Sequence, residues 1–121
     1  MRGIAFWFIA TGSVFVTIGM VGGIAMSIAA DHTFAPAHAH LNLVGWVTMA
    51  LFGFYYHLVP AAGATSLARI HFAVATIGVI TMIPGIMFAI VEQGELLAKV
   101  GSLLSLASML IFVFTVLRNR T

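Results

Sequence analysis

Five histidines stand out in a chain whose other side chains are mostly apolar: His32, His38, His40, His57 and His71. Of the 121 residues, 62% are hydrophobic and only 7% carry a full charge. Neutral imidazole is the commonest metal ligand in proteins, and it also binds haem iron axially. There is no cysteine, which excludes disulfides and thiolate metal sites. Any metal or proton chemistry in this chain therefore depends first on its histidines.

The stretch Ala37-His38-Ala39-His40 is the most informative. Two residues along an α-helix correspond to a rotation of about 200°, so His38 and His40 point to nearly opposite faces. Such a pair does not suit one small tetrahedral ion, but each histidine could serve a large centre or a subunit interface on its own side. Small alanines beside them leave room for a flat macrocycle. The alternative is that both imidazoles lie half-solvated at the membrane surface.

The remaining histidines favour that simpler interpretation. His32 stands beside Asp31 in an expected loop, and His57 follows Tyr55 and Tyr56, which are typical of an aromatic belt at a membrane surface. His71 is expected at the same depth as His57. We therefore rank His32, His57 and His71 below His38 and His40 as metal ligands and expect them at the interface.

The elements that must position these residues are membrane-spanning helices. A bilayer core about 30 Å thick needs about 20 apolar residues per helix, and barrel strands would alternate polar and apolar residues. Four segments are long and apolar enough, over residues 4–30, 36–60, 69–91 and 96–118. The sequence predicts an all-α membrane protein, a single domain over residues 1–121, built as an antiparallel bundle of four transmembrane helices.

Basic residues set the orientation. With four spans, Arg2, Arg69, Arg118 and Arg120 all fall on one side, and Asp31, Glu92 and Glu95 on the other. The positive-inside rule then places both termini in the cytoplasm of a cell whose inner (plasma) membrane holds the protein. The segment 36–60 runs inward, with His38 and His40 near the outer face. The basic residues stand singly at helix ends, so they do not form the basic patch that is typical of nucleic-acid-binding proteins. Gly19 and Gly23, in GxxxG spacing, predict close approach of another helix to the first one.

A longer pattern surrounds the histidine pair. Ala37-His38-Ala39-His40-Leu41 is followed by Gly45-Trp46, Met49, Phe52-Gly53, Tyr55-Tyr56 and Leu58-Val59-Pro60. This segment resembles the tenth transmembrane helix of subunit I in haem-copper oxidases, particularly the C-family oxidases and nitric oxide reductases. In that family the first histidine of the pair binds the high-spin haem and the second the low-spin haem. The resemblance implies that His38 and His40 are axial ligands of haem iron, with b-type haem as the expected cofactor.

Much of a family subunit has no counterpart here. The chain contains no adjacent histidine pair and no His-to-Tyr arrangement for a copper site, so copper is unsupported and the sequence leaves open whether the protein is an enzyme. The opposite ligand of the low-spin haem is also missing from one copy. A family subunit is a pseudo-threefold array of four-helix units, which favours a homotrimer, and next a dimer, with haem held between subunits.

The expected function is haem binding in the bilayer, for electron transfer with a donor or for gas binding. Two alternatives stay open: an oligomeric oxygen or nitric oxide reductase, and a cofactor-free structural or accessory membrane subunit.

Overall fold

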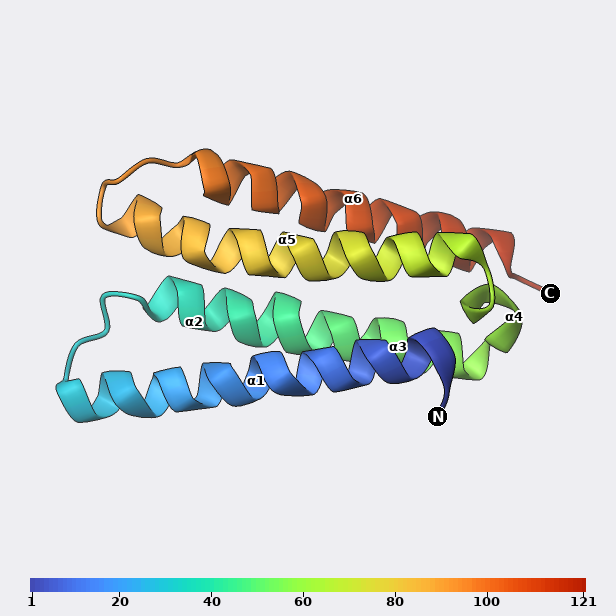
Figure 1. Cartoon of the computed structure of the whole chain (residues 1–121), viewed down its shortest axis with the longest axis horizontal. Coiled ribbons are helices and arrows are strands. Elements are labelled where there is room, and N and C mark those ends of the chain that lie inside the picture. Colours follow the sequence, from blue (N-terminus) through green and yellow to red (C-terminus); the bar gives the residue numbers. More distant parts are fainter.

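The computed structural model describes all 121 residues, and every regular element in it is a helix (Figure 1). The elements in chain order are α1 (Gly3–Ala29), α2 (Ala35–Asn42), the π-helical segment η1 (Leu43–Thr48), α3 (Met49–Leu58), α4 (Pro60–Gly63), α5 (Ser66–Ile90) and α6 (Leu96–Arg118). The all-helical fold expected from the sequence is confirmed.

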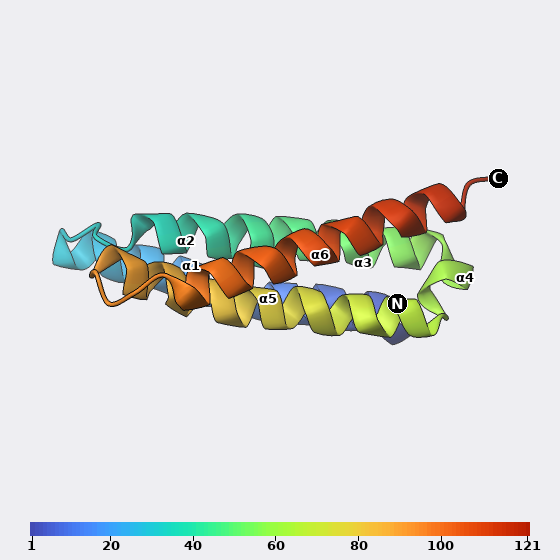
Figure 2. The same ribbon diagram turned by 90° about the horizontal axis from the view of Figure 1, so that it is seen from above.

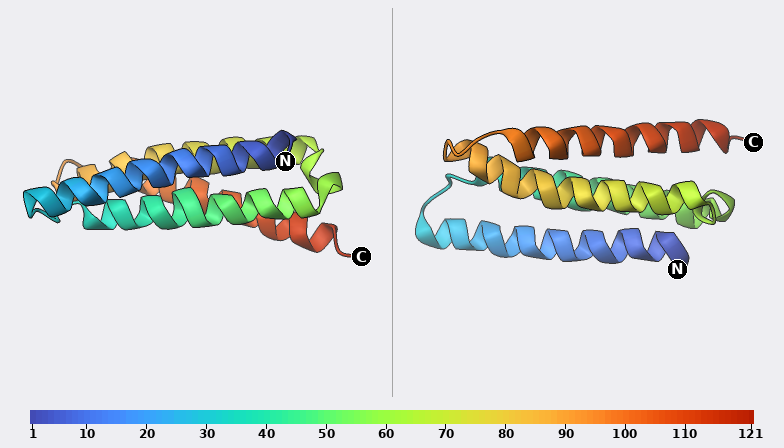
Figure 3. Two further views of the ribbon diagram at one scale, coloured as in Figure 1. Left: turned by 90° about the horizontal axis from the view of Figure 1, so that it is seen from below. Right: turned by 45° about the horizontal axis from the view of Figure 1, so that its top comes forward.

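The helices form two antiparallel pairs that lie side by side. In one pair α1 packs against α2, η1 and α3, and in the other α5 packs against α6. The views from above and below show all these rods running nearly parallel to one long axis (Figures 2 and 3). In the first pair, α2 also contacts α5, which joins the two pairs into one bundle.

Local chemistry explains where the elements end. Pro60 has no backbone N–H and restricts the residue before it, so α3 stops at Leu58 and Val59 is non-helical (φ −124°, ψ 71°). Pro60 then starts the short helix α4, where its missing donor costs nothing. Thr65 caps the next helix: its hydroxyl oxygen accepts a hydrogen bond from the Ala68 N–H at 3.1 Å.

The predicted spanning helix over residues 36–60 is the main difference from expectation. Three helices, α1, α5 and α6, are each long and apolar enough to cross a membrane, whereas residues 36–60 are divided among α2, η1 and α3, of 8, 6 and 10 residues. The prediction of four uninterrupted spanning helices is therefore wrong for this segment. The ribbon nevertheless continues without a break from α2 through α3 (Figure 1).

The physical reason for the π-helical turn is the spacing of the buried residues. They recur every four positions, at Ala37, Leu41, Gly45 and Met49. At about 100° per residue, an ordinary α-helix would rotate such a stripe by about 40° at each step. The wider π turn takes up this drift and keeps the stripe directed into the bundle. The Thr48 hydroxyl donates to the Leu43 carbonyl at 3.0 Å and closes the turn.

The second pair shows how closely two helices approach in this fold. A Cβ atom added at Gly85 of α5 would lie 2.3 Å from the Ala98 backbone nitrogen, and one at Gly101 of α6 would lie 2.5 Å from the Met82 backbone. Neither position can hold a larger residue without separating the helices. Close packing of backbones is the usual basis of helix association in lipid, where apolar burial alone gives little driving force.

The surface is apolar. Only 23 of the 121 residues are buried, and large hydrophobic side chains such as Ile28, Leu58 and Leu103 are more than 60% exposed. Three spanning helices with such a surface make the chain a multi-pass membrane protein in contact with lipid.

Both chain termini lie at one end of the bundle (Figure 1). We call this the arginine end, because the four arginines belong to it: Arg2, Arg69, Arg118 and Arg120. The opposite end holds two loops, one between α1 and α2 and the other between α5 and α6. We call it the acidic end, after Asp31, Glu92 and Glu95.

Candidate functional sites at the two ends of the bundle

His38 lies in the groove between α1 and α2 at the acidic end. Its ring packs on Gly23, where an added Cβ would lie 2.8 Å from the imidazole Cε1, while Gly19 makes the same kind of space for Asn42. The close approach predicted from the GxxxG spacing is confirmed. The Asn42 amide nitrogen lies 3.3 Å from His38 Nε2, and His38 Nδ1 is buried without a hydrogen-bond partner. His38 therefore points inward.

An apolar cavity of about 270 Å³ adjoins His38. Residues of α1, α2 and α5 line it, among them Gly22, Met26, Leu41 and Met87, together with Phe34 just before α2. Small-ligand sites typically span ~300–1,000 Å³, so this space within one chain holds part of a flat macrocycle at most.

His40 has the opposite environment. Its side chain is exposed, and its Nδ1 lies 2.7 Å from the Pro36 carbonyl oxygen one turn earlier. Because a carbonyl only accepts, Nδ1 must carry the proton, which leaves the Nε2 lone pair of the neutral ring free. This is the tautomer that metal-binding histidines adopt when a backbone carbonyl holds their other nitrogen. The predicted division of His38 and His40 between two faces of the helix is confirmed.

The two exposed histidines elsewhere stand alone. His32 lies in the loop at the acidic end, and His57 lies near the end of α3 at the arginine end. No three histidine, aspartate or glutamate side chains come together in a way that could hold a metal ion.

Electrostatics at the acidic end are local. Asp31 is fully exposed, and the Thr33 hydroxyl and backbone N–H both donate to its Oδ1. These hydrogen bonds, first that of the hydroxyl, hold the pKa of Asp31 below its ordinary value, and the neighbouring His32 lowers this pKa further. The Asp31 carboxylate thus accepts its hydrogen bonds within its own turn.

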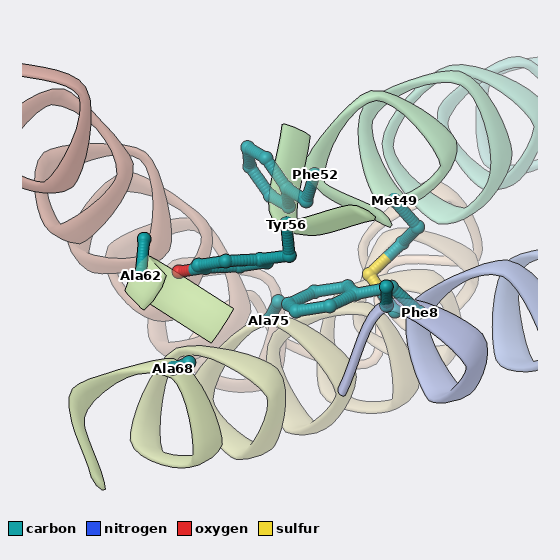
Figure 4. Close-up of a cluster of buried hydrophobic side chains, with 8 residues drawn as sticks. Phe8, Met49, Phe52, Tyr56, Ala62, Ala68 and Ala75 are labelled. Atoms are coloured by element: carbon teal, nitrogen blue, oxygen red, sulfur yellow. The ribbon is translucent and has the colours of Figure 1, made fainter. Parts of the chain in front are cut away.

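His71 occupies a quite different site, near the start of α5 at the arginine end. Its side chain is completely buried, and its Nδ1 lies 2.7 Å from the hydroxyl oxygen of Tyr56, itself 2% exposed. Rings of Phe52, Phe8 and Phe112 lie around it, with centroids 4.4, 5.1 and 6.0 Å from the imidazole. Its second nitrogen, Nε2, is buried without a partner. Figure 4 shows Tyr56, Phe52 and Phe8 together in the cluster of buried hydrophobic side chains.

His71 and Tyr56 are not half-solvated as expected, because both side chains are buried between helices. Tyr56 belongs to the buried hydrophobic cluster and stacks on Phe8 with ring centroids 5.6 Å apart, and the His71 ring also packs on Phe8. A signal was present in the sequence: His71 lies on the stripe of small residues that α5 turns toward its neighbours, which includes Ala68, Ala75 and Gly78. Residues that share a face with such a stripe are expected to be buried between helices.

The chain matches no protein-family model, no curated protein and no solved structure. Chemical interpretation therefore starts from the side chains themselves. At the acidic end, a histidine with a free nitrogen faces outward and can bind a group lying outside its own bundle. At the arginine end, a hydrogen-bonded histidine and tyrosine are enclosed by aromatic rings and can exchange a proton with each other.

Proposed function

We propose that this protein binds haem within the membrane, with His40 as the principal axial ligand and His38 as the second candidate. The observation that carries the proposal is the state of His40: an exposed imidazole whose Nδ1–H is held by the Pro36 carbonyl and whose Nε2 is free to coordinate. The resemblance of the surrounding helix to that of haem-copper oxidases motivates the choice of b-type haem.

The residues near His40 suit a flat, apolar cofactor. Ala39 is small and exposed beside it, and Leu43 and Val47, farther along the helix, are exposed by 60% and 45%. His38 fits less well, because its imidazole would have to give up Asn42 and leave the groove at Gly23. When bound, haem would supply reversible one-electron chemistry or a site for a small gas.

The proposal includes oligomerisation, because one copy presents only one such outward histidine on this helix. A twofold dimer would place two His40 side chains across a shared interface. A trimer, suggested by the pseudo-threefold family subunit, would pair His40 of one copy with a different histidine of the next, for which exposed His32 is available. In both assemblies the haem lies between subunits.

Topology is part of the proposal. The π turn leaves residues 36–60 helical from Ala35 to Leu58, so this segment can serve as a fourth crossing. The arginine end would face the cytoplasm of a cell whose inner (plasma) membrane holds the protein. Because the natural chain has no cysteine, single cysteines placed at residue 64 and at residue 93 would report each side cleanly by labelling with a membrane-impermeant maleimide.

Absorption spectra test the haem site. Protein expressed with added haem is expected to show a Soret band that shifts on reduction, lost in His40→Ala and weakened in His38→Ala. His57→Ala, which removes an exposed histidine at the opposite end, serves as the matched control and should keep the spectrum. A colourless wild-type preparation would contradict the proposal and favour a structural subunit. An unchanged spectrum in His40→Ala would remove His40 as the ligand.

Two further measurements separate the uses of the haem. A bis-histidine haem should not bind carbon monoxide, whereas a five-coordinate haem should. Native mass spectrometry of the coloured protein should give two or more chains for each haem. A monomer that retains six-coordinate haem would exclude a site between subunits. A second metal in stoichiometric amount would instead indicate a reductase.

A further inference from the structure

A small cavity lies beside the π turn, where the first helix pair meets the second. It is lined by seven residues of η1, α3, α5 and α6: Val44, Thr48, Met49, Phe52, Ala75, Ser105 and Ser108. Three of them, Met49, Phe52 and Ala75, are labelled in Figure 4. We propose that this cavity binds one water molecule, held by the hydroxyls of Thr48, Ser105 and Ser108, and that the water links η1 to α6.

The Ser105 hydroxyl is the group in this cavity that lacks a partner. Hydroxyls within a helix commonly donate to the carbonyl four residues earlier, and those of Ser102 and Thr115 in the same helix do so at 2.7 and 2.8 Å. The Ser105 oxygen is buried and makes no hydrogen bond. Buried polar groups are nearly always satisfied by protein or by ordered water. A water molecule beside Ser105 would meet this requirement.

Ser105 can reach the cavity from its present position. Its oxygen lies against α5, 3.2 Å from the Cβ that Gly78 would carry. A serine side chain has three staggered positions about its Cα–Cβ bond. A turn about that bond can move the hydroxyl away from Gly78 and toward the cavity that Ser105 lines. Ser108 lines the same cavity and is 3% exposed, so its hydroxyl is also inside the bundle.

The size of the cavity suits a single water molecule. The space open to the centre of a water-sized sphere is about 20 Å³. One buried water needs about 10–15 Å³ of such space, together with two to four polar partners. Three hydroxyl side chains line this cavity, and none of its seven residues is charged. An ion would therefore find no charged partner there, and a larger molecule would not fit.

The donors and acceptors of the three hydroxyls complement those of water. The Thr48 hydroxyl donates to the Leu43 carbonyl at 3.0 Å, so its oxygen remains free to accept. The water accepts a hydrogen bond from the Ser105 hydroxyl and donates to the oxygens of Thr48 and Ser108. Because α6 packs mainly on α5, this water adds a polar link between α6 and the first helix pair.

The experiment detects the water in the full-length protein. Protein labelled with ¹³C and ¹⁵N is placed in bilayers of lipids with deuterated acyl chains, and short transfer of magnetisation from water protons is followed by solid-state NMR. Strong transfer to Ser105 and Ser108 is expected. Leu106 and Leu110, which lie beside them on α6 and are 55% and 59% exposed, should receive little, because their surroundings are lipid. The readout needs no haem, so it is independent of the haem proposal.

Serine-to-alanine variants test the ligands of the water. Ser105→Ala removes the donor, so transfer to Ser108 should fall about fivefold, the factor that one net hydrogen bond contributes to an equilibrium. Ser108→Ala should weaken transfer to Ser105 to a similar degree. Ser102→Ala is the matched control on the same helix: Ser102 is exposed and already bonded to the Ala98 carbonyl. It should leave both signals unchanged.

Two results would overturn the water site. One is wild-type transfer to Ser105 and Ser108 that is no stronger than transfer to Leu106 and Leu110, which would make the cavity dry. The other is an undiminished signal at Ser108 in Ser105→Ala. Far-UV circular dichroism establishes that each variant is folded. If Ser105→Ala does not fold, the signal of Ser105 in Ser108→Ala decides the outcome.

Discussion

The two ends of the bundle use the same residue type in opposite ways. At the acidic end, His40 is exposed and keeps one nitrogen free, while its other nitrogen is held by a carbonyl of its own helix. At the arginine end, His71 is fully enclosed and its hydrogen-bond partner comes from another helix. The first arrangement leaves a nitrogen available to a ligand from outside the chain, and the second joins two helices inside it. The two sites hold the same residue type, and they differ in how the neighbouring helices pack around it.

The largest expected effect concerns stability at the arginine end. Phe8 is completely buried and contacts both Tyr56 and His71. Phe8→Ala should lower the free energy of unfolding by about 3 kcal/mol, the low end for such changes, because lipid solvates the separated helices as well. Phe6→Ala, on the same helix but 46% exposed, should cost less than about 0.5 kcal/mol. Unfolding in mixed micelles, followed by circular dichroism, measures both. Equal effects would mean that the aromatic cluster does not hold the bundle.

A pair of neighbouring glycines tests the acidic end. An added Cβ at Gly23 would lie 2.8 Å from the His38 ring, whereas one at Gly22 would meet nothing within 4 Å. Alanine is the better helix former, so Gly22→Ala should stabilise α1 by up to about 1 kcal/mol. Gly23→Ala should be less stable than Gly22→Ala by about 1–2 kcal/mol, since His38 must move. If the two variants unfold alike, His38 does not occupy the groove, and its rank as a haem ligand rises.

The smallest effect is expected in the exposed turn beside the histidines. Thr33→Val removes the hydroxyl that donates to Asp31, so the pKa of that carboxyl should rise toward its ordinary value. A ¹³C NMR titration of the carboxyl carbon measures the change, with Thr17→Val as a control in the middle of α1. Little change in stability is expected, because the group is fully exposed. An unchanged pKa would mean that the turn is not formed in the membrane.

Composition was enough to predict most of the fold. Long apolar segments separated by single charges correctly indicated helices, but they predicted four spanning helices where three are long and apolar enough. The π turn could not be predicted in the same way, because it responds to packing. The four-residue spacing from Ala37 to Met49 reveals it only once the partner helix is known. Gly19 and Gly23 indicated a close contact but did not identify His38 and Asn42 as its occupants.

The candidate sites were predictable to different degrees. Two-residue spacing was sufficient to place His38 and His40 on separate faces, because helical rotation is a local property. The burial of His71 depends on residues far away in sequence, Tyr56 and Phe8 among them. The polarity of the adjacent residues, Arg69 and Ile70, did not indicate which face of the helix is buried. In a membrane helix both the lipid-facing and the packed side are apolar, so hydrophobicity does not separate them.

The wide turn at Leu43–Thr48 has a mechanical consequence for the segment that carries both sites. Across it, the α-helical rotation of about 100° per residue is interrupted. Because a π turn holds one residue more than an α turn, deleting one residue there would restore an α-helix and leave His38 and His40 with nearly their present directions relative to Tyr56. A deletion elsewhere in the segment would rotate the two parts by about 100° relative to each other. Leu43–Thr48 is thus the place in this segment where losing one residue would least change the direction of the two histidines relative to the aromatic cluster.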